Sequence, residues 1–255
     1  SEKAAGDLLL FVDADTLLSE GTIAATVTDS IKNEVDLLAV MPRRVAGCIS
    51  EQLMFPFIDW AAFCWMPMKQ AHKSGSPHLS AAFGQFMLFK REAYESIGGH
   101  AAVKATPLDD LELVRLTKKL GLKWMLFEGA TSVQVLPYKG NIDALKGVSR
   151  SVFPALYYRF SLLMLGTAIL LTVGYLPIVL LVTSIMSHPE NSSKLLMAAA
   201  SISMIAAPWF IICRKFDHTR LTTLFYPVAI TLMIVLAFHS MAVYRMGFTS
   251  WKDRK

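Results

Sequence analysis

Three long stretches without a charged residue constrain the fold of this sequence more than any other feature. The stretches run from Phe160 to Pro189, from Leu195 to Cys213 and from Leu221 to Tyr244. A helix of about 20 apolar residues is long enough to cross a hydrocarbon core of about 30 Å. Buried helices of a large soluble protein are the alternative, and three such stretches close together argue against it. We therefore predict a membrane domain over 159–255, with hydrophobic helices at 160–187, 195–213 and 221–244.

The topology of this membrane domain stays open. Basic residues favour the cytosolic side of a membrane, and they occupy both the loop 214–220 and the C-terminal tail. A cytosolic first half followed by three crossings would place that tail outside. Pro177 interrupts the first stretch, which could tilt, kink or begin along the interface. We expect a multi-pass protein of the cell membrane with a cytosolic first half, and leave open whether all three helices cross fully.

Charged residues divide the chain near Tyr158. Residues 1–158 contain 16 basic and 17 acidic residues, whereas residues 159–255 contain 9 and 3. The first part has the charge content of an ordinary globular domain. The basic excess lies beside the apolar stretches, where it indicates contact with lipid headgroups. We therefore expect no nucleic-acid partner, although the chain carries a net charge of +5.

Apolar runs alternate with helical patterns through residues 1–158. Strands are predicted at 8–12, 36–41, 84–90, 123–127 and 131–136, and helices at 21–34, 91–97 and 109–120. This alternation is typical of an α/β domain with a mostly parallel sheet. The segment 54–68 is dense in aromatic residues and Met, which suits either core packing or an apolar acceptor groove at a membrane interface.

Two pairs of carboxylates are the first candidates for chemistry. Asp13 and Asp15 directly follow the apolar strand 8–12, and residues i and i+2 of an extended segment point the same way. Both carboxylates can then approach one Mg²⁺ or Mn²⁺, ions that prefer oxygen ligands. Asp109 and Asp110 open a helix, where one can cap the helix and the other accept a proton from an attacking hydroxyl. A solvated turn and simple helix capping are the respective alternatives.

Glycine and basic residues supply further candidates. Gly84 and Gln85 precede a predicted strand, and a glycine there would let the backbone approach a ligand closely. Arg150 lies shortly before the membrane domain. Its guanidinium could neutralise a phosphate leaving group or could reach lipid headgroups instead.

The strings GDLLLFVDADT, GQFMLFKREAYESIGGH and LDDLELVRLTKKLG together resemble family 2 glycosyltransferases, which have the GT-A fold. The second string and the later YKG are most similar to membrane glycosyltransferases of carotenoid and hopanoid pathways, of the diaponeurosporenoate glycosyltransferase type. The resemblance covers about residues 1–158 and extends loosely into the apolar helices. It implies inverting transfer of a sugar from a nucleotide-diphosphate sugar to a lipid or isoprenoid acceptor.

The resemblance also implies roles for matching positions. Asp13 and Asp15 would hold the divalent metal, Mg²⁺ or Mn²⁺, and the nucleotide diphosphate. Asp110 would be the general base, and Asp109 stands where the family commonly has Glu.

Two departures from the family pattern accompany these matches. Gly84 and Gln85 match the loop that lines the donor sugar and the acceptor. The first departure is that the family's first strand and its nucleoside-binding Asp are expected upstream and are absent. We therefore expect residues 1–158 to be an incomplete GT-A domain from a longer protein. The Q-x-x-R-W motif is also missing, with Arg150 near its place, which argues against a processive polysaccharide synthase. A non-catalytic family member and another metal-dependent nucleotidyl- or phosphotransferase remain alternatives.

Overall fold

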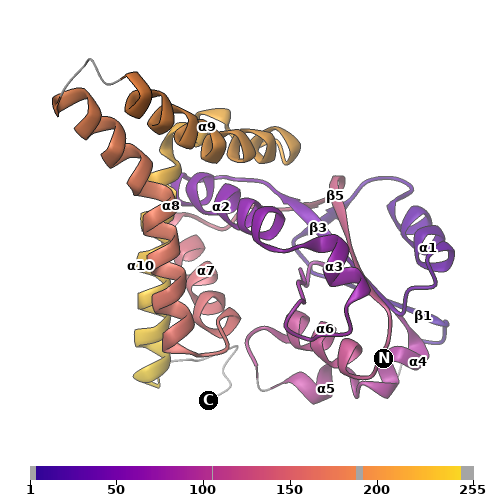
Figure 1. Cartoon of the computed structure of the whole chain (residues 1–255). Coiled ribbons are helices and arrows are strands. Elements are labelled where there is room, and N and C mark those ends of the chain that lie inside the picture. Colours follow the sequence, from indigo (N-terminus) through magenta and orange to yellow (C-terminus); the bar gives the residue numbers. More distant parts are fainter. Residues whose placement is uncertain (1–3, 105, 188–191, 248–255) are drawn as a thin grey trace. The chain divides into compact units, whose positions relative to one another are not determined.

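The computed structural model describes residues 4–104, 106–187 and 192–247, which form two compact units (Figure 1). We call residues 1–45 and 61–137 the sheet unit, and residues 46–60 and 138–255 the helical unit. The predicted domains, 1–158 and 159–255, divide the chain elsewhere, and that assignment stays a prediction. The basic residues of the tail, 252, 254 and 255, lie outside the described residues.

A five-stranded mixed sheet forms the centre of the sheet unit. Its strands are β1 (Leu8–Val12), β2 (Thr16–Leu18), β3 (Leu37–Arg44), β4 (Phe86–Lys90) and β5 (Trp124–Val135), in the order β1-β4-β3-β5-β2. Among these strands, β3 and β5 form the one parallel pair, and the other three pairs are antiparallel. The prediction of a mostly parallel sheet is therefore wrong.

The prediction relied on the alternation of strands and helices, which does not determine strand direction, and β4 illustrates the difficulty. Its residues Phe86–Phe89 are all buried, and such a continuous apolar run is typical of parallel strands covered on both faces. An antiparallel strand covered on both faces has the same pattern. Because β4 lies between β1 and β3 and runs against both, the apolar run recorded its burial and not its direction.

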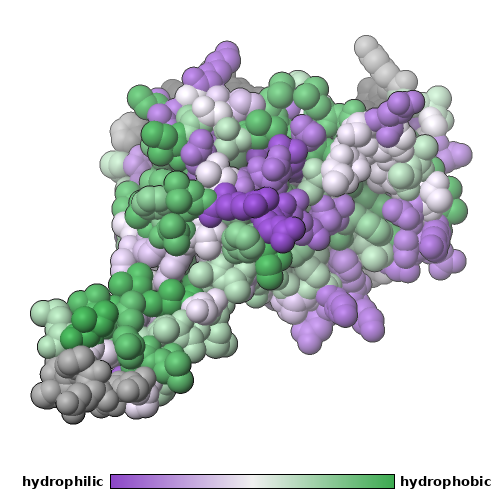
Figure 2. All heavy atoms as spheres, turned by 90° about the horizontal axis from the view of Figure 1, so that it is seen from above, coloured by the Kyte–Doolittle hydropathy of each residue, from purple (hydrophilic) through white to green (hydrophobic). Residues whose placement is uncertain are grey.

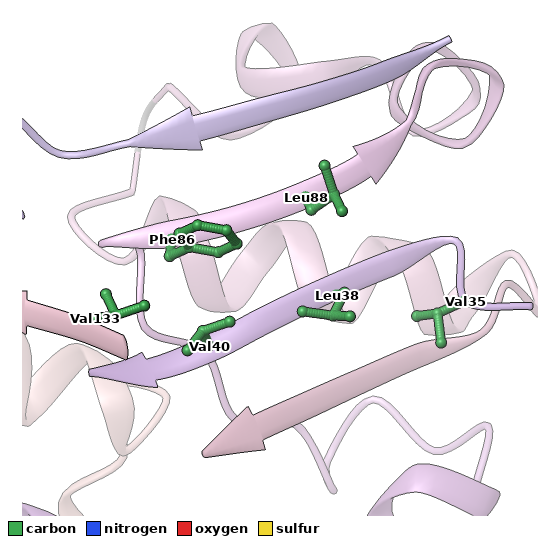
Figure 3. Packing of buried hydrophobic residues seen from close by; sticks show 6 residues of the cluster. All are labelled: Val35, Leu38, Val40, Phe86, Leu88 and Val133. Atoms are coloured by element: carbon green, nitrogen blue, oxygen red, sulfur yellow. The ribbon is translucent and has the colours of Figure 1, made fainter. Parts of the chain in front are cut away.

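Helices cover both faces of the sheet. Below α1 (Thr22–Lys32) lies a cluster of buried side chains, formed by Val35, Leu38, Val40, Phe86, Leu88 and Val133 (Figure 3). Val27 of α1 packs against this cluster. Each Å² of apolar surface removed from water stabilises the folded state by about 25 cal/mol. Contacts of this kind are therefore the main source of stability.

The opposite face is covered by α3 (Met68–Lys73) and α6 (Asp109–Lys119). His72 of α3 accepts the backbone N–H of Leu126 in β5 at 3.2 Å. Lys118 of α6 donates to the carbonyls of Ala71, at 2.8 Å, and Leu79, and lies over the ring of Trp124. Burial lowers the pKa of Lys118 to about 8, because it disfavours the charged form of the side chain. The contacts with Ala71, Leu79 and Trp124 offset this cost and fix α6 against α3 and the sheet.

The short helices α4 (Arg91–Ser96) and α5 (Gly99–Val103) follow β4 and lead toward α6. The helical unit contains the first part of α2 (Ile49–Trp65), which ends in the sheet unit. Its further helices are α7 (Asn141–Ala155), α8 (Phe160–Ser187), α9 (Ser192–Lys215), η1 (Arg220–Phe225) and α10 (Tyr226–Arg245).

Three segments of the helical unit are long and apolar enough to cross a membrane. They are Phe160–Met186, Ser193–Lys215 and Arg220–Arg245. Hydrophobic side chains crowd the surface that α8 and α9 present (Figure 2). The three predicted hydrophobic helices are therefore present, and the last one begins with the 3₁₀ turn η1.

Two carboxylates of α2 lie fully buried within the helical unit. Glu51 accepts backbone N–H groups from Gly47, at 2.7 Å, and Cys48, at 3.0 Å, and a third from Tyr138 at 2.7 Å. Asp59 lies 2.7 Å from Nε2 of His218, in the turn before η1. These two carboxylates fix α2 to segments far away in the sequence.

Candidate active site

Three segments of the sheet unit meet where β1 ends beside the start of β4. Asp13 donates its backbone N–H to the carbonyl of Gln85 at 3.3 Å. Gly84 donates its backbone N–H to Oδ2 of Asp110, at the beginning of α6, at 2.9 Å. The structure thus brings together Asp13, the Gly84-Gln85 segment and Asp110, which are far apart in the sequence.

The closeness of this contact favours glycine at position 84. A Cβ atom there would lie 3.3 Å from Cβ of Asp110, which is tighter than most such contacts and would displace Asp110 slightly. The other oxygen, Oδ1, accepts the backbone N–H of Leu111 at 2.7 Å. Two backbone donors therefore hold the carboxylate of Asp110 in one orientation.

The surroundings of Asp110 make its carboxyl group a weaker acid than usual. Burial raises its pKa, and the negative charges of Asp109 and Asp13 raise it further, whereas the hydrogen bonds from Leu111 and Gly84 lower it. The pKa rises from 3.8 to about 6 as a result. A carboxylate with a pKa near the working pH can accept a proton effectively in a reaction.

Asp109 is the first residue of α6, and the capping position before it is Leu108, which has no side-chain cap hydrogen bond. Oδ1 of Asp109 accepts the backbone N–H of Asp110 at 3.0 Å, and the residue is exposed. Asp109 therefore acts on Asp110 through its charge, and Asp110 is the carboxylate that faces Gly84.

Asp13 and Asp15 occupy the tight turn between β1 and β2. The carbonyl of Asp13 accepts the N–H of Thr16 at 3.1 Å, and the carbonyl of Asp15 accepts the N–H of Leu136 at 2.9 Å. Both residues are exposed, and these hydrogen bonds fix the turn through its backbone.

This turn fits a metal ion that is bound together with a substrate. Among the described residues, no group of three or more His, Cys, Asp or Glu is placed to hold a metal ion. Mg²⁺ is commonly bound by one or two carboxylates, with water and substrate phosphates completing its shell. Asp13 and Asp15 supply that number of carboxylates. Nearby, Oε1 of Gln85 is buried without a hydrogen-bond partner in the part of the chain that the structure describes, which leaves an acceptor for a ligand group.

Gly98, Gly99 and His100 support the site through contacts with β1. Gly99 has a φ of 54°, and a Cβ atom there would lie 2.6 Å from the ring of Tyr94. The hydroxyl of Tyr94 lies 2.8 Å from Nδ1 of His100, and both rings lie against Phe11 of β1. Burial lowers the pKa of His100, with the charge of Asp109 opposing that shift. The segment therefore fixes α5 next to β1 and the start of α6.

Arg150 belongs to α7 of the helical unit, and its Nε donates to the carbonyl of Lys146 at 3.3 Å. Its assignment to the donor phosphates stays a prediction. The sheet unit also has an apolar cavity, lined by Ala62, Phe63 and Met68 of the segment 54–68 and by residues of β3 and β5. The sequence allowed either core packing or an acceptor groove for this segment, but its place against these two strands was not predicted.

No family model matches this chain, and no curated protein matches it. Among solved structures, the mannosyltransferase PcManGT from Pyrobaculum calidifontis, in complex with GDP-Man and Mn²⁺, is similar over 98% of this chain and 65% of its own chain, with 15% identity and a TM-score of 0.46. This chain thus spans less than two thirds of that protein's length. A TM-score of this size does not establish a common fold, so function has to be inferred from the site itself.

Proposed function

We propose that this protein transfers a sugar from a nucleotide-diphosphate sugar to a lipid or isoprenoid acceptor, with inversion at the anomeric carbon. The observation that carries this proposal is the carboxylate of Asp110, which is held by Gly84 close to the turn of Asp13 and has a pKa of about 6. The resemblance to family 2 glycosyltransferases gives further support, because the residues that carry it meet at this point of the structure.

In the proposed reaction, Asp110 removes the proton of the acceptor hydroxyl. The hydroxyl oxygen bonds to the anomeric carbon while the bond from that carbon to the diphosphate oxygen breaks, and the nucleoside diphosphate leaves with the electron pair. The N–H groups of Gly84 and Leu111 hold the carboxylate in place during this step. Above pH 6 the carboxyl group is mostly ionised and ready to accept the proton.

Asp13 and Asp15 are proposed to hold Mg²⁺ or Mn²⁺ together with the donor diphosphate. When bound, such a cation offsets the negative charge of the leaving nucleoside diphosphate. Gly84 and Gln85 are proposed to line the donor sugar and the acceptor, and Arg150 to bind the diphosphate.

The three apolar helices favour a place in the cell membrane, where a lipid acceptor is available. We propose a multi-pass arrangement with the sheet unit on the cytosolic side, where nucleotide sugars are found.

A product analysis tests the proposed reaction. The full chain in detergent is mixed with Mn²⁺, a polyprenol and a panel of radiolabelled nucleotide sugars, and the label is followed into the organic phase. We expect label transfer, release of nucleoside diphosphate and loss of both with EDTA. Release of pyrophosphate would point to a nucleotidyltransferase, and no turnover with any donor would indicate a non-catalytic protein.

A further inference from the structure

A cavity of about 150 Å³ lies on the face of the sheet that α3 covers. It is lined by Met41, Ala62, Phe63, Met68, Leu126 and Phe127, with Glu128 as the one charged residue among them. Side chains alternate between the two faces of a strand. Val40 belongs to the cluster below α1, so Met41 next to it points to the face of α3.

The strand register places this cavity near the carboxylate site. The pairing of Leu10 with Leu88 and of Leu38 with Leu88 sets β1 and β3 on the two sides of β4 at the same level. Neighbouring strands lie about 4.8 Å apart, so Val12 at the end of β1 and Val40 at the same level of β3 are roughly 10 Å apart. Asp13 follows the end of β1, and Met41 lies in the corresponding part of β3.

Helix α6 connects the two places on this face. It begins with Asp109 and Asp110 at the carboxylate site, and its Lys118 contacts Ala71 in α3. Met68, in the first turn of α3, lines the cavity. Within the sheet unit, α6 therefore joins the proposed base, in its first turn, to α3, whose first turn lines the cavity.

The lining determines which ligand can enter. No basic residue is among the described residues that line the cavity, and Glu128 would repel a phosphate or carboxylate. Oε1 of Glu128 accepts the N–H of Ala130 at 2.7 Å, so one of its oxygens is used within the protein. An apolar cavity of this size takes a group of about six carbons.

We propose that this cavity binds an uncharged hydrocarbon segment of about five or six carbons, which belongs to the acceptor whose hydroxyl group reaches Asp110. The proposal rests on the proposed function for the identity of the acceptor. The binding of a hydrocarbon segment is inferred from the cavity alone. This binding and the identity of the acceptor can therefore be tested separately.

Photolabelling with a diazirine analogue of farnesol, an uncharged prenyl alcohol, tests the cavity directly. The full chain in detergent is irradiated with the probe, and the adducts are mapped by mass spectrometry. Adducts on the lipid-exposed helix α8 serve as an internal reference. We expect adducts within 62–68 and 126–128 that unlabelled farnesol displaces, whereas adducts on α8 persist.

Two variants and a matched control sharpen this test. Ala62→Trp fills the cavity and should reduce cavity adducts at least tenfold relative to those on α8, and the smaller change Ala62→Leu should reduce them less. Ala61→Trp makes the same change one residue away, outside the cavity lining, and should leave the labelling intact. Thermal unfolding of each variant identifies any that fails to fold.

The outcomes separate the cavity from the reaction. Displaceable cavity adducts that Ala62→Trp removes support the proposal, even if no sugar donor is turned over, which would overturn the proposed function only. Absence of cavity adducts in the wild-type chain, or equal adducts in Ala62→Trp and Ala61→Trp, would show that the cavity is a packing void and would overturn the proposal.

Discussion

Asp110 of the sheet unit and Glu51 of the helical unit are both carboxylates held by backbone N–H groups, and they differ in the number of these groups. Glu51 accepts N–H groups from Gly47, Cys48 and Tyr138 and is fully buried. Asp110 accepts two such groups but lies near the negative charges of Asp109 and Asp13.

We interpret Glu51 as a structural carboxylate and propose Asp110 as a reactive one. Hydrogen bonds to a carboxylate favour its charged form, whereas burial and nearby negative charges disfavour it. At Asp110 burial and charge outweigh the hydrogen bonds, and the pKa rises to about 6. We therefore expect changes at Asp110 to affect the reaction, and changes at Glu51 and Asp59 to affect folding.

The largest effect is expected for Asp110→Asn. Loss of the proton acceptor should lower the initial rate of sugar transfer by about 10²–10⁴-fold. Asp109→Asn is the matched control, and it should lower the rate less than tenfold, because Asp109 is exposed and acts on Asp110 through its charge. A rate for Asp110→Asn within threefold of wild type would show that Asp110 is not the base.

Glu51→Ala should lower the free energy of unfolding by about 3 kcal/mol, because three backbone N–H groups lose their acceptor. Glu51→Gln keeps one acceptor oxygen and should cost about 1 kcal/mol. Denaturant unfolding of the full chain measures both. An unfolding free energy of Glu51→Ala equal to that of wild type would show that Glu51 does not hold α2 through these hydrogen bonds.

Asp59→Ala should cost about 2 kcal/mol, because it leaves the buried ring of His218 without its partner. The pair is tested by a double-mutant cycle with His218→Gln, in which the two changes together should cost less than the sum of the single changes. Strict additivity would mean that the 2.7 Å contact contributes nothing to stability.

An effect of comparable size is the pH dependence of stability caused by Asp110. Its pKa in the folded protein, about 6, exceeds the ordinary 3.8, so the folded state keeps its proton to a higher pH than the unfolded state does. This contribution to stability is complete below pH 4 and is lost as the pH rises through 6.

Unfolding free energies of wild type and Asp110→Asn, measured from pH 4 to pH 7, check this contribution. The wild type should lose about 1–3 kcal/mol relative to the variant over that interval. Parallel curves for the two proteins would contradict a raised pKa at Asp110.

Sequence patterns predicted several local elements of this protein, although the strands expected at 123–127 and 131–136 form the single strand β5. The strand 8–12, the helix at Asp109 and the three apolar helices follow from runs and periodicities within one segment. The direction of β4 does not follow from such patterns, because burial on both faces looks the same in parallel and antiparallel strands. Strand direction depends on pairing between segments, which one sequence does not record.

The same limit applies to the sites. Each pair of acids was recognisable from its place beside a strand or helix, but the contact of Gly84 with Asp110 joins segments 26 positions apart. The apolar cavity joins the end of α2 to β5, and Glu51 depends on Tyr138. No local pattern marks these partners, so their roles become visible only in the folded chain.

The pH dependence of sugar transfer tests the central claim, that Asp110 is the base of the reaction, most directly. Initial rates are measured between pH 5 and pH 8 with saturating donor and Mn²⁺ and an uncharged polyprenol as acceptor. The rate should rise about tenfold per pH unit below pH 6 and level off above it, following the ionisation of Asp110. A rate that stays constant from pH 5 to pH 8 would contradict the assignment of Asp110 as the base.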